Sequence, residues 1–278
     1  MMYRSNSLNA FPFIRPFARQ TKRDIKSTFN TMSKFVEEEI ERHQASFQPD
    51  SEPRDFIDCY LAEMARQPDL YTKEDLTMIL IDLFLGGTET SANLLAYALL
   101  QMILNPEIQE KVHQEIMEVV GPNKLPTMKD RASLPYTKAT VQESLRACTL
   151  VPLMVRATLK DITIGGYNVP KGTILWINQW NLHHNPAKWP SPDKFDPSRF
   201  LDKPDTVAQS DNFLPFGAGR KVCLGEQLAK MELFLFFACI MHRFKFSIPP
   251  GYERPSAEPI FKFLNNAPPF ELMISERS

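Results

Sequence analysis

Several features that would place this chain in a special class of protein are scarce or missing. It has four cysteines in 278 residues, with no C-x-x-C pair, which excludes a disulfide scaffold and favours a reducing compartment. Its 32 basic and 33 acidic residues leave a formal net charge of -1, so no overall field would attract nucleic acid. The longest apolar run, Leu233 to Met241, has nine residues, about half of what spans a bilayer. We therefore expect a globular chain with no nucleic-acid partner, no membrane anchor and no secretory signal.

Residues 1 to about 150 carry helical patterns. Thr72 and Asp75 form a capping box, and the helix that they open can continue to Asn105. Its centre, Ile79 to Leu85, is apolar on nearly every side, which predicts that it passes through the core. Asn105 is expected to cap the next helix, with Pro106 at its first position. Further helices are predicted over residues 28–43, 106–120 and 136–150.

The second half is rich in turns and short β-prone runs. The segments 162–164, 167–169 and 173–177 are separated by glycine and proline signals and predict a small β meander. A last helix is expected from Leu224 to His242, with a core face made of Leu224, Leu228, Met231, Leu235 and Cys239. Cys59 and Cys148 are also expected in the core. The predicted fold class is mainly α with a small β meander.

The most specific segment runs from Phe216 to Gly225, with a single cysteine, Cys223, just before the last predicted helix. A sulfur there faces unpaired backbone N–H groups and the positive end of the helix dipole, which favours the thiolate. Two glycines would let a flat ligand approach the backbone, and two basic residues could meet its anionic groups. These are Gly219, Gly225, Arg220 and Lys221. A thiolate in such a site suits a haem iron, whereas the alternative is an ordinary buried cysteine after a glycine-rich turn.

The centre of the long helix contains a second unusual segment, Gly86-Gly87-Thr88-Glu89-Thr90-Ser91. Each glycine costs roughly 1 kcal/mol in a helix interior, so the pair needs a reason. One reason is a close helix crossing. The other is a local opening of the helix that admits a small ligand and water, with Thr90 as hydrogen-bond donor and Glu89 as proton carrier.

Glu143 and Arg146 lie three residues apart on one predicted helix, a spacing that is typical of an exposed ion pair. A second interpretation is a buried network with Arg199, from the stretch Phe195-Asp196-Pro197-Ser198-Arg199-Phe200. Adjacent His183 and His184 are not expected to bind a metal, because neighbouring side chains diverge and no third ligand is suitably spaced.

These segments together resemble the cytochrome P450 family. The segment 216–225 fills every fixed position of the family's haem loop, F-x-x-G-x-[RHK]-x-C-x-G, and residues 86–91 fill its oxygen-activating pattern, [AG]-G-x-[DE]-T-[TS]. The E-x-x-R pair at Glu143 and the P-x-R-F stretch at Arg199 follow in the family's order. The resemblance covers about Tyr71 to Glu271 and is closest to microsomal animal members that oxidise steroids and drug-like lipophiles.

The resemblance implies a haem cofactor whose iron takes Cys223 as its axial ligand, covered by Phe216. Lys221 or Arg220 would meet a haem propionate, and Glu89 and Thr90 would deliver protons to oxygen. Glu143, Arg146 and Arg199 would lock the loop under the haem. A lipophilic substrate would contact apolar residues at Leu80, Phe84, Leu85, Val151, Leu153 and Val155.

The implied function is a haem-thiolate monooxygenase that takes electrons from an NADPH-cytochrome P450 reductase at the endoplasmic reticulum membrane. The chain corresponds to a carboxy-terminal portion of the family's fold: residues 1–70 resemble the F and G helices, 71–150 run from the oxygen helix to the E-x-x-R helix, and 151–278 hold the small sheet, haem loop and last helix. A second possibility stays open, in which the chain is a non-catalytic truncated fragment of such an enzyme.

Overall fold

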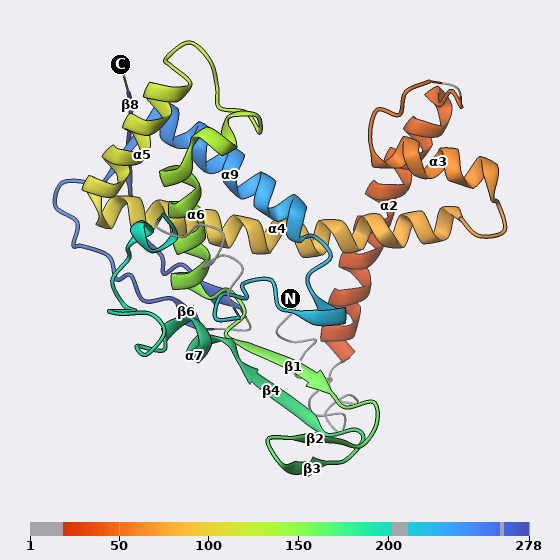
Figure 1. Cartoon of the computed structure of the whole chain (residues 1–278). Helices are drawn as coiled ribbons and strands as arrows, with labels where there is room; N and C mark the ends of the chain where they lie inside the picture. The colour runs from red at the N-terminus through yellow and green to blue at the C-terminus, as the bar shows by residue number, and fades with distance from the viewer. Residues whose placement is uncertain (1–18, 50, 202–210, 262–263, 278) are drawn as a thin grey trace. The chain divides into compact units, whose positions relative to one another are not determined.

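The computed structural model describes residues 19–49, 51–201, 211–261 and 264–277 (Figure 1). The helices are α2 (Arg19–Ser46), α3 (Phe56–Arg66), α4 (Lys73–Leu104), α5 (Pro106–Val119), α6 (Pro135–Cys148), α7 (Gln179–His184) and α9 (Glu226–Arg243). The strands are β1 (Leu153–Ala157), β2 (Ile162–Ile164), β3 (Tyr167–Val169), β4 (Ile174–Asn178), β5 (Phe244–Ser247), β6 (Ile260–Phe261), β7 (Asn265–Asn266) and β8 (Met273–Glu276). The predicted class, mainly helical with small antiparallel sheets, is confirmed.

The chain divides into two compact units, and the boundary lies inside α4, between Thr88 and Glu89. The boundaries at residues 70 and 150 follow the order of the family's segments and stay a prediction. Residues 1–18 of the predicted amino-terminal region lie outside the described residues.

The first unit contains α2, α3 and the first half of α4. As the capping box predicts, the Thr72 hydroxyl accepts a hydrogen bond from the Asp75 backbone N–H at 3.1 Å, and α4 begins at Lys73. One apolar cluster forms the core of this unit: Val36, Ile40, Tyr60, Leu61, Leu76, Leu80 and Ile81. Cys59 was expected in the core but is exposed, because α3 turns its neighbours Tyr60 and Leu61 inward instead.

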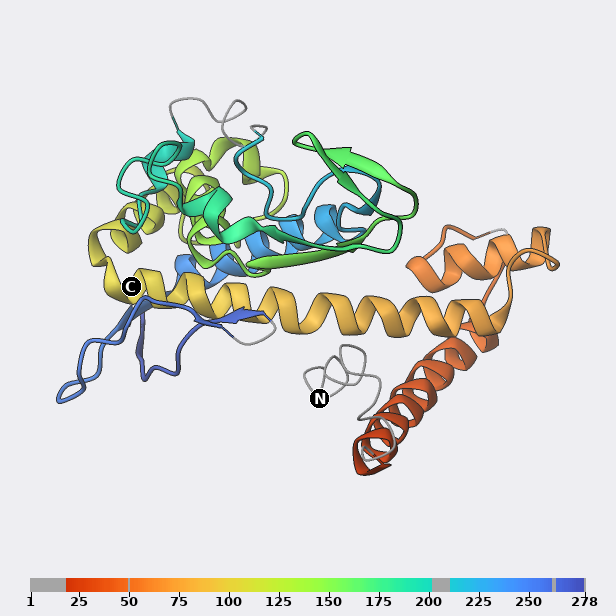
Figure 2. The same ribbon diagram turned by 90° about the horizontal axis from the view of Figure 1, so that it is seen from below.

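The second unit contains the carboxyl half of α4 and all later elements. Figure 1 and Figure 2 both show α9 beside the second half of α4. The long α4 was expected to be buried at its centre, but Ile79, Leu83, Phe84 and Leu85 are exposed. Leu80 and Ile81 of that centre are buried with Leu76 in the first cluster, and the second cluster takes up the helix from Leu94 onward, so one side of the centre is buried and the other is exposed.

The core face of α9 differs from the predicted one. Leu224 precedes the helix and is almost fully exposed, and Leu228 and Met231 are exposed as well. Leu235 is half-buried against the core cluster, and Cys239 is half-buried. The buried face follows the i, i+3, i+4, i+7 spacing from a different residue: Phe234, Phe237, Ala238 and Met241. Because α9 is apolar around most of its circumference, its periodicity could not select the face that packs.

The small β structure also pairs differently from a continuous meander. In the described residues, β2 pairs with β3 as a hairpin, whereas β4 pairs antiparallel with β1, with Val155 opposite Trp176. Strand β1 was not expected from the sequence. Asn105 occupies the N-cap position of α5, but its side-chain amide donates to the Gln101 carbonyl at 2.9 Å and so closes the end of α4.

Candidate functional site

The segment that precedes α9 forms a closed loop. The Cys223 backbone N–H donates to the Phe216 carbonyl at 2.9 Å, and a single 3-10 turn, Gly219–Lys221, lies between them. This bond brings the backbones of Phe216 and Cys223 together although they are seven positions apart. Cys223 is reduced and exposed. Cys223 is therefore accessible at the end of the loop.

Two glycines in the loop have backbone angles that favour glycine. Gly217 has a φ of +79°, and an added Cβ would approach the Met154 methyl carbon at 3.3 Å. Gly219 has a φ of +71°, but an added Cβ would enter open space. The first glycine allows close packing on β1, and the second leaves room beside the loop. Gly219 was expected from the sequence to have this role, and Gly217 was not.

The loop has basic side chains around it. Arg220 and Lys221 are exposed, and Arg156 of β1 donates from its Nη2 to the Lys221 carbonyl at 3.2 Å. The sequence analysis missed Arg156, because it lies 65 residues from Lys221 in the chain and only the β1–β4 pairing aims it at the loop. On the other side, Lys230 Nζ lies 5.5 Å from the centre of the Phe216 ring, which favours one orientation of that ring.

The helix after the loop begins later than the sequence suggested. α9 starts at Glu226, with Gly225 as its N-cap. The Glu226 N–H still points to the Cys223 carbonyl at 3.4 Å. Cys223 thus stands three residues before the first helical residue, at the amino end of α9.

Glu89 and Thr90 lie in an uninterrupted stretch of α4, which is helical from Lys73 to Leu104. The local opening expected at Gly86 and Gly87 is therefore not seen in this part of the chain. The next residue, Ser91, donates from its hydroxyl to the Glu232 carboxylate of α9 at 3.2 Å. The helix that carries Glu89 and Thr90 is thus joined directly to the helix that follows Cys223.

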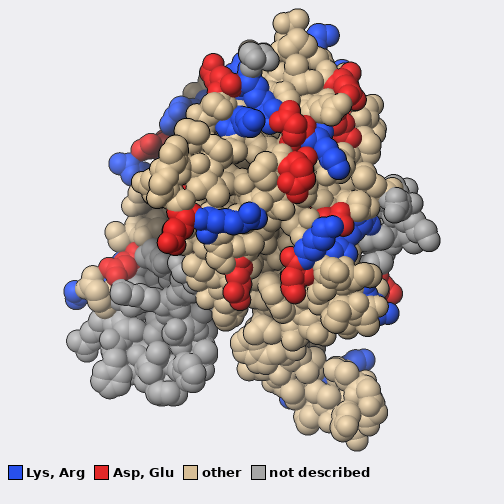
Figure 3. All heavy atoms as spheres, turned by 90° about the vertical axis from the view of Figure 1, so that its left-hand side faces the viewer, with Lys and Arg blue, Asp and Glu red and all other residues tan. Residues whose placement is uncertain are grey.

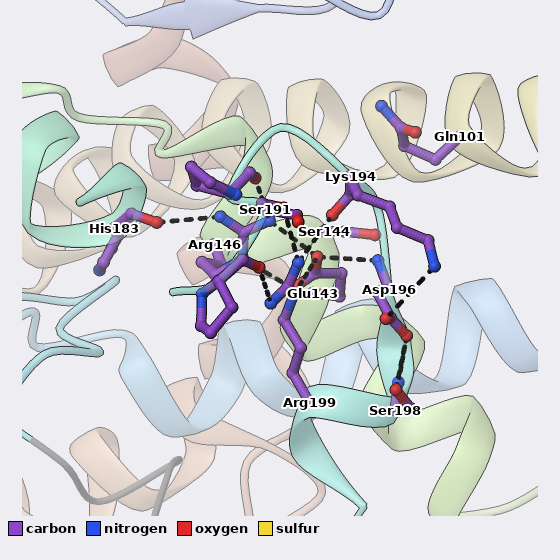
Figure 4. A network of polar contacts seen from close by, with 12 residues as sticks. Gln101, Glu143, Ser144, Arg146, His183, Ser191, Lys194, Asp196, Ser198 and Arg199 are labelled. Carbon is purple, nitrogen blue, oxygen red and sulfur yellow. Dashed lines mark hydrogen bonds and ion pairs between the residues drawn. The ribbon is translucent and has the colours of Figure 1, made fainter. Parts of the chain in front are cut away.

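Glu143 and Arg146 form a buried pair, not the exposed one of the simpler interpretation (Figure 4). Both side chains are 0% exposed, and Arg146 Nη2 and Nε donate to the two Glu143 oxygens at 2.7 and 2.8 Å. Arg199 Nε lies 3.5 Å from Glu143 Oε1, so the three residues named from the sequence lie together. Burial raises the pKa of the Glu143 carboxyl, and the Arg146 guanidinium acts against that rise.

The guanidinium groups of Arg146 and Arg199 also donate hydrogen bonds to backbone carbonyls at the end of α7 and in the loop that follows it. Arg146 donates to the carbonyls of His183 and Pro192 at 2.9 and 2.8 Å, and Arg199 donates to those of Pro190 and Ser191 at 2.6 and 2.8 Å. Glu143 accepts the backbone N–H of Asp196 at 2.9 Å. Removing one of these charged side chains would therefore leave several backbone groups, as well as its ionic partner, without a hydrogen-bond partner.

His183 connects this network to the Cys223 loop. Its Nε2 accepts the Leu214 N–H at 3.1 Å, and its Nδ1 lies 3.0 Å from the Thr149 hydroxyl, whose proton is directed to the Arg146 carbonyl. The proton of the imidazole is therefore on Nδ1, and burial lowers the pKa of His183 to about 3, which keeps the ring neutral. Gln179 holds the Leu214 carbonyl. The role of His183 was not expected from the sequence, because it depends on burial that only the structure shows.

The apolar residues assigned to substrate lie in both units. In the first unit, Leu80 is buried in the apolar cluster, whereas Phe84 is exposed and meets the Phe35 ring edge-on at 5.8 Å. Leu85 is exposed. In the second unit, Val151 is half-buried, and Leu153 and Val155 are exposed on the same face of β1.

Comparisons with known proteins agree on one family. The cytochrome P450 family model matches residues 1–274. Cytochrome P450 2U1 of Mus musculus is 42% identical over 265 residues, which are 93% of this chain and 48% of that protein. Cytochrome P450 2J1 of Oryctolagus cuniculus is 42% identical over 251 residues, or 88% of this chain and 49% of that protein.

Solved structures give the same result. A zebra fish cytochrome P450 with progesterone matches 94% of this chain and 61% of its own, with 31% identity and a TM-score of 0.83. The chain spans about half the length of the curated relatives that it matches. Among the described residues, no helix has both the length and the hydropathy that crossing a membrane requires. With the family model matched over 274 residues and a loop that presents a reduced cysteine at the start of α9, the chain belongs to the cytochrome P450 family.

Proposed function

We propose that this protein is a haem-thiolate monooxygenase that inserts one atom of O2 into a lipophilic substrate, with electrons from an NADPH-cytochrome P450 reductase. The observation that carries the proposal is the closed loop: the Cys223 N–H donates to the Phe216 carbonyl, and Cys223 is exposed three residues before the start of α9. The amino end of a helix favours an anionic ligand atom such as a thiolate.

The residues of the loop fit a haem. Cys223 would be the axial ligand, and Phe216 would lie beside it. The open space at Gly219 and Gly225 accommodates a flat macrocycle, and Arg220 and Lys221 are cations available to its carboxylates. When bound, haem would supply oxygen activation and electron storage, with the thiolate favouring O–O cleavage.

Residues of α4 would act on the face of the haem opposite Cys223. The Thr90 hydroxyl would hold a hydrogen bond toward the oxygen site, and the exposed Glu89 carboxylate would bring protons from solvent. This retained pair favours monooxygenation over a family activity that rearranges peroxides, which needs no proton delivery.

The proposed substrate is apolar, steroid-like or drug-like. The exposed side chains of Phe84, Leu85, Leu153 and Val155 are apolar and offer no cationic anchor for a carboxylate or phosphate substrate. A zebra fish relative was solved with progesterone, which agrees with a lipophilic steroid. By analogy with microsomal relatives, the protein would act at the endoplasmic reticulum membrane.

The test is the absorption spectrum of the reduced protein with carbon monoxide after reconstitution with haem. We expect the red-shifted Soret band of a thiolate-ligated haem, and its loss in Cys223→Ser. Cys59→Ser is the matched control, because Cys59 is also an exposed cysteine and should leave the band unchanged. A thiolate-type band that persists in Cys223→Ser would refute the assignment.

The same haem-reconstituted preparation also tests the second interpretation, in which the chain is a non-catalytic fragment. One haem per chain that resists transfer to apomyoglobin supports an enzyme. We expect weak binding from this chain alone, because it spans about half the length of its curated relatives. By the family resemblance, Cys223 and Thr90 would face the two sides of the haem, whereas further contacts to its edge would come from the rest of the fold. Each missing charge-assisted contact costs about 1.5 to 3 kcal/mol.

A further inference from the structure

Helix α7 carries two polar side chains that are buried. Gln179 is 3% exposed and His183 is 0% exposed, and their spacing of four residues places them on the same side of the helix. On the face where α5 and β8 lie, by contrast, acidic and basic side chains are interspersed at the surface (Figure 3). Burying an amide or an imidazole costs free energy unless its polar atoms are hydrogen-bonded. The hydrogen-bond partners of these two residues therefore indicate their role.

Both side chains bind the backbone of one residue, Leu214. Its N–H donates to His183 Nε2 at 3.1 Å, and its carbonyl accepts a hydrogen bond from Gln179 Nε2. Two side chains one helical turn apart thus hold both polar backbone groups of a single loop residue. Leu214 follows Gln179 by 35 positions in the chain, so the contact ties a distant loop to α7. Within the described residues, Gln179 Oε1 has no partner, so the side-chain amide acts on Leu214 alone.

Leu214 stands at the start of the Cys223 loop. Its carbonyl also accepts the Gly217 N–H at 3.0 Å, which forms a tight turn. Pro215 lies inside this turn, and its ring fixes one of the backbone angles. The Phe216 carbonyl then accepts the Cys223 N–H at 2.9 Å. The position of Leu214 is therefore passed to Cys223 through two backbone hydrogen bonds and one rigid residue.

His183 is itself held on two sides. Its Nδ1 lies 3.0 Å from the Thr149 hydroxyl, which donates to the Arg146 carbonyl at 2.7 Å. Thr149 has a φ of +40°, a left-handed conformation that is unusual for a β-branched residue. The His183 carbonyl accepts a hydrogen bond from Arg146 Nη1 at 2.9 Å (Figure 4). The ring and the backbone of His183 are thus both fixed by the segment that carries the buried Glu143–Arg146 pair.

We propose that Gln179 and His183 are positioning residues that clamp Leu214 and thereby set the position of the Cys223 sulfur. Holding both polar groups of Leu214 fixes the orientation of that residue as well as its place. Apolar side chains at positions 179 and 183 would fill the same space, but they would leave the Leu214 N–H and carbonyl without these partners. The inference rests on the proposed function only in taking Cys223 as the iron ligand, because the clamp is present in the chain without haem.

The first measurement uses the full chain without haem, so that it does not depend on the proposed function. His183→Phe keeps an aromatic ring near Phe213, whose ring centre lies 5.7 Å from that of the imidazole, but removes both ring nitrogens. We expect the backbone amides of residues 214–223 to exchange about tenfold faster in hydrogen–deuterium exchange, because losing one hydrogen bond has about that effect on local opening. Circular dichroism checks that the variant is folded.

The second measurement follows Cys223 itself. A nitroxide spin label is attached to Cys223 in a background of Cys59→Ser and Cys239→Ser, in which Cys148 is buried and does not react. In electron paramagnetic resonance spectra, we expect the rotational correlation time of the label to fall at least twofold in His183→Phe, because the loop is no longer held. An unchanged spectrum would mean that the position of the loop start is not passed to the sulfur.

Three further variants separate the clamp from a general effect of α7. His184→Phe is the matched control, because this neighbouring histidine stacks on Trp180, with ring centres 3.7 Å apart, and should change neither measurement. His183→Gln should restore slow exchange to within threefold of the unmodified chain, because the glutamine oxygen can accept the Leu214 N–H. Gln179→Leu removes the bond to the Leu214 carbonyl and should accelerate exchange at least threefold, which tests the clamp even if His183→Phe does not fold.

The haem-loaded chain separates this inference from the proposed function. With carbon monoxide, the thiolate-type Soret band should be lost at least threefold faster in His183→Phe than in the unmodified chain. If no thiolate-type band forms in the unmodified chain while the haem-free measurements come out as expected, the proposed function fails and the clamp stands. Equal exchange in His183→Phe and His184→Phe, or equal stability of the band in the unmodified chain and His183→Phe, would overturn the clamp.

Discussion

Replacing Glu143 by glutamine should destabilise the second unit by about 3 to 5 kcal/mol, the usual effect of stranding one member of a buried ion pair. Glutamine keeps the shape of the side chain but removes its charge, while Arg146 stays 0% exposed. In the unmodified protein, both Glu143 oxygens accept hydrogen bonds from Arg146, at 2.7 and 2.8 Å. In the variant, an NH2 group replaces one of these oxygens. A donor would then face a donor inside the core.

The chain contains a matched control with the same spacing. Glu63 and Arg66 are also three apart on a helix and form a contact of 2.9 Å, but their side chains are 38% and 73% exposed. Glu63→Gln should change the free energy of unfolding by no more than about 0.5 kcal/mol, because solvent screens such pairs. The two substitutions differ in burial and not in chemistry.

The assay is urea unfolding of both variants, followed by far-UV circular dichroism and by tryptophan fluorescence. All three tryptophans, Trp176, Trp180 and Trp189, belong to the second unit, so fluorescence reports the unit that contains Glu143. Glu63 lies in the first unit, so circular dichroism, which reports both units, compares the two variants. Equal losses in Glu143→Gln and Glu63→Gln would refute the argument from burial.

Four further predictions follow from particular contacts. The pKa of His43 is raised above 6.5, first by a hydrogen bond to the Glu39 carbonyl and also by the Asp55 carboxylate at 2.8 Å, while burial acts against the rise. The protonated pair should therefore contribute its full stability below pH 6.5. As pH rises through the raised pKa, about 0.5 to 1 kcal/mol of stability should be lost. Asp55→Asn should flatten that pH dependence in thermal melts, and an unchanged slope would contradict it. Gln109→Leu should cost about 2 kcal/mol in urea unfolding, because the buried amide makes three hydrogen bonds to backbone groups of α4 and β5 that would lose their partner. In the holoenzyme, Thr90→Ala should lower product formed per NADPH consumed while leaving the haem spectrum unchanged; unchanged coupling would remove Thr90 from proton delivery. Spectral titrations of the haem-loaded protein should detect steroids and not small polar acids, and tight binding of polar acids alone would refute a lipophilic substrate.

Local sequence determined much of this protein. The Thr72 capping box and the proline at position 106 placed the starts of α4 and α5, because helix ends depend on hydrogen bonds within about four residues. The segment around Cys223 was recognisable for the same reason. Its glycines, its cysteine and the helix that follows are contiguous, so the loop that they form closes on itself.

Contacts between distant segments were decided only by the tertiary structure. Glu63–Arg66 and Glu143–Arg146 have the same spacing, and nothing within either helix says that one pair is exposed and the other buried. The core face of α9 was mispredicted for a related reason: a helix that is apolar on most sides is oriented by its neighbours. Arg156 lies on a strand 65 residues before the Lys221 carbonyl that it contacts, and only the pairing of β1 with β4 aims it there. Burial depends on which surfaces meet, and that is a property of the packed chain as a whole and not of any short segment.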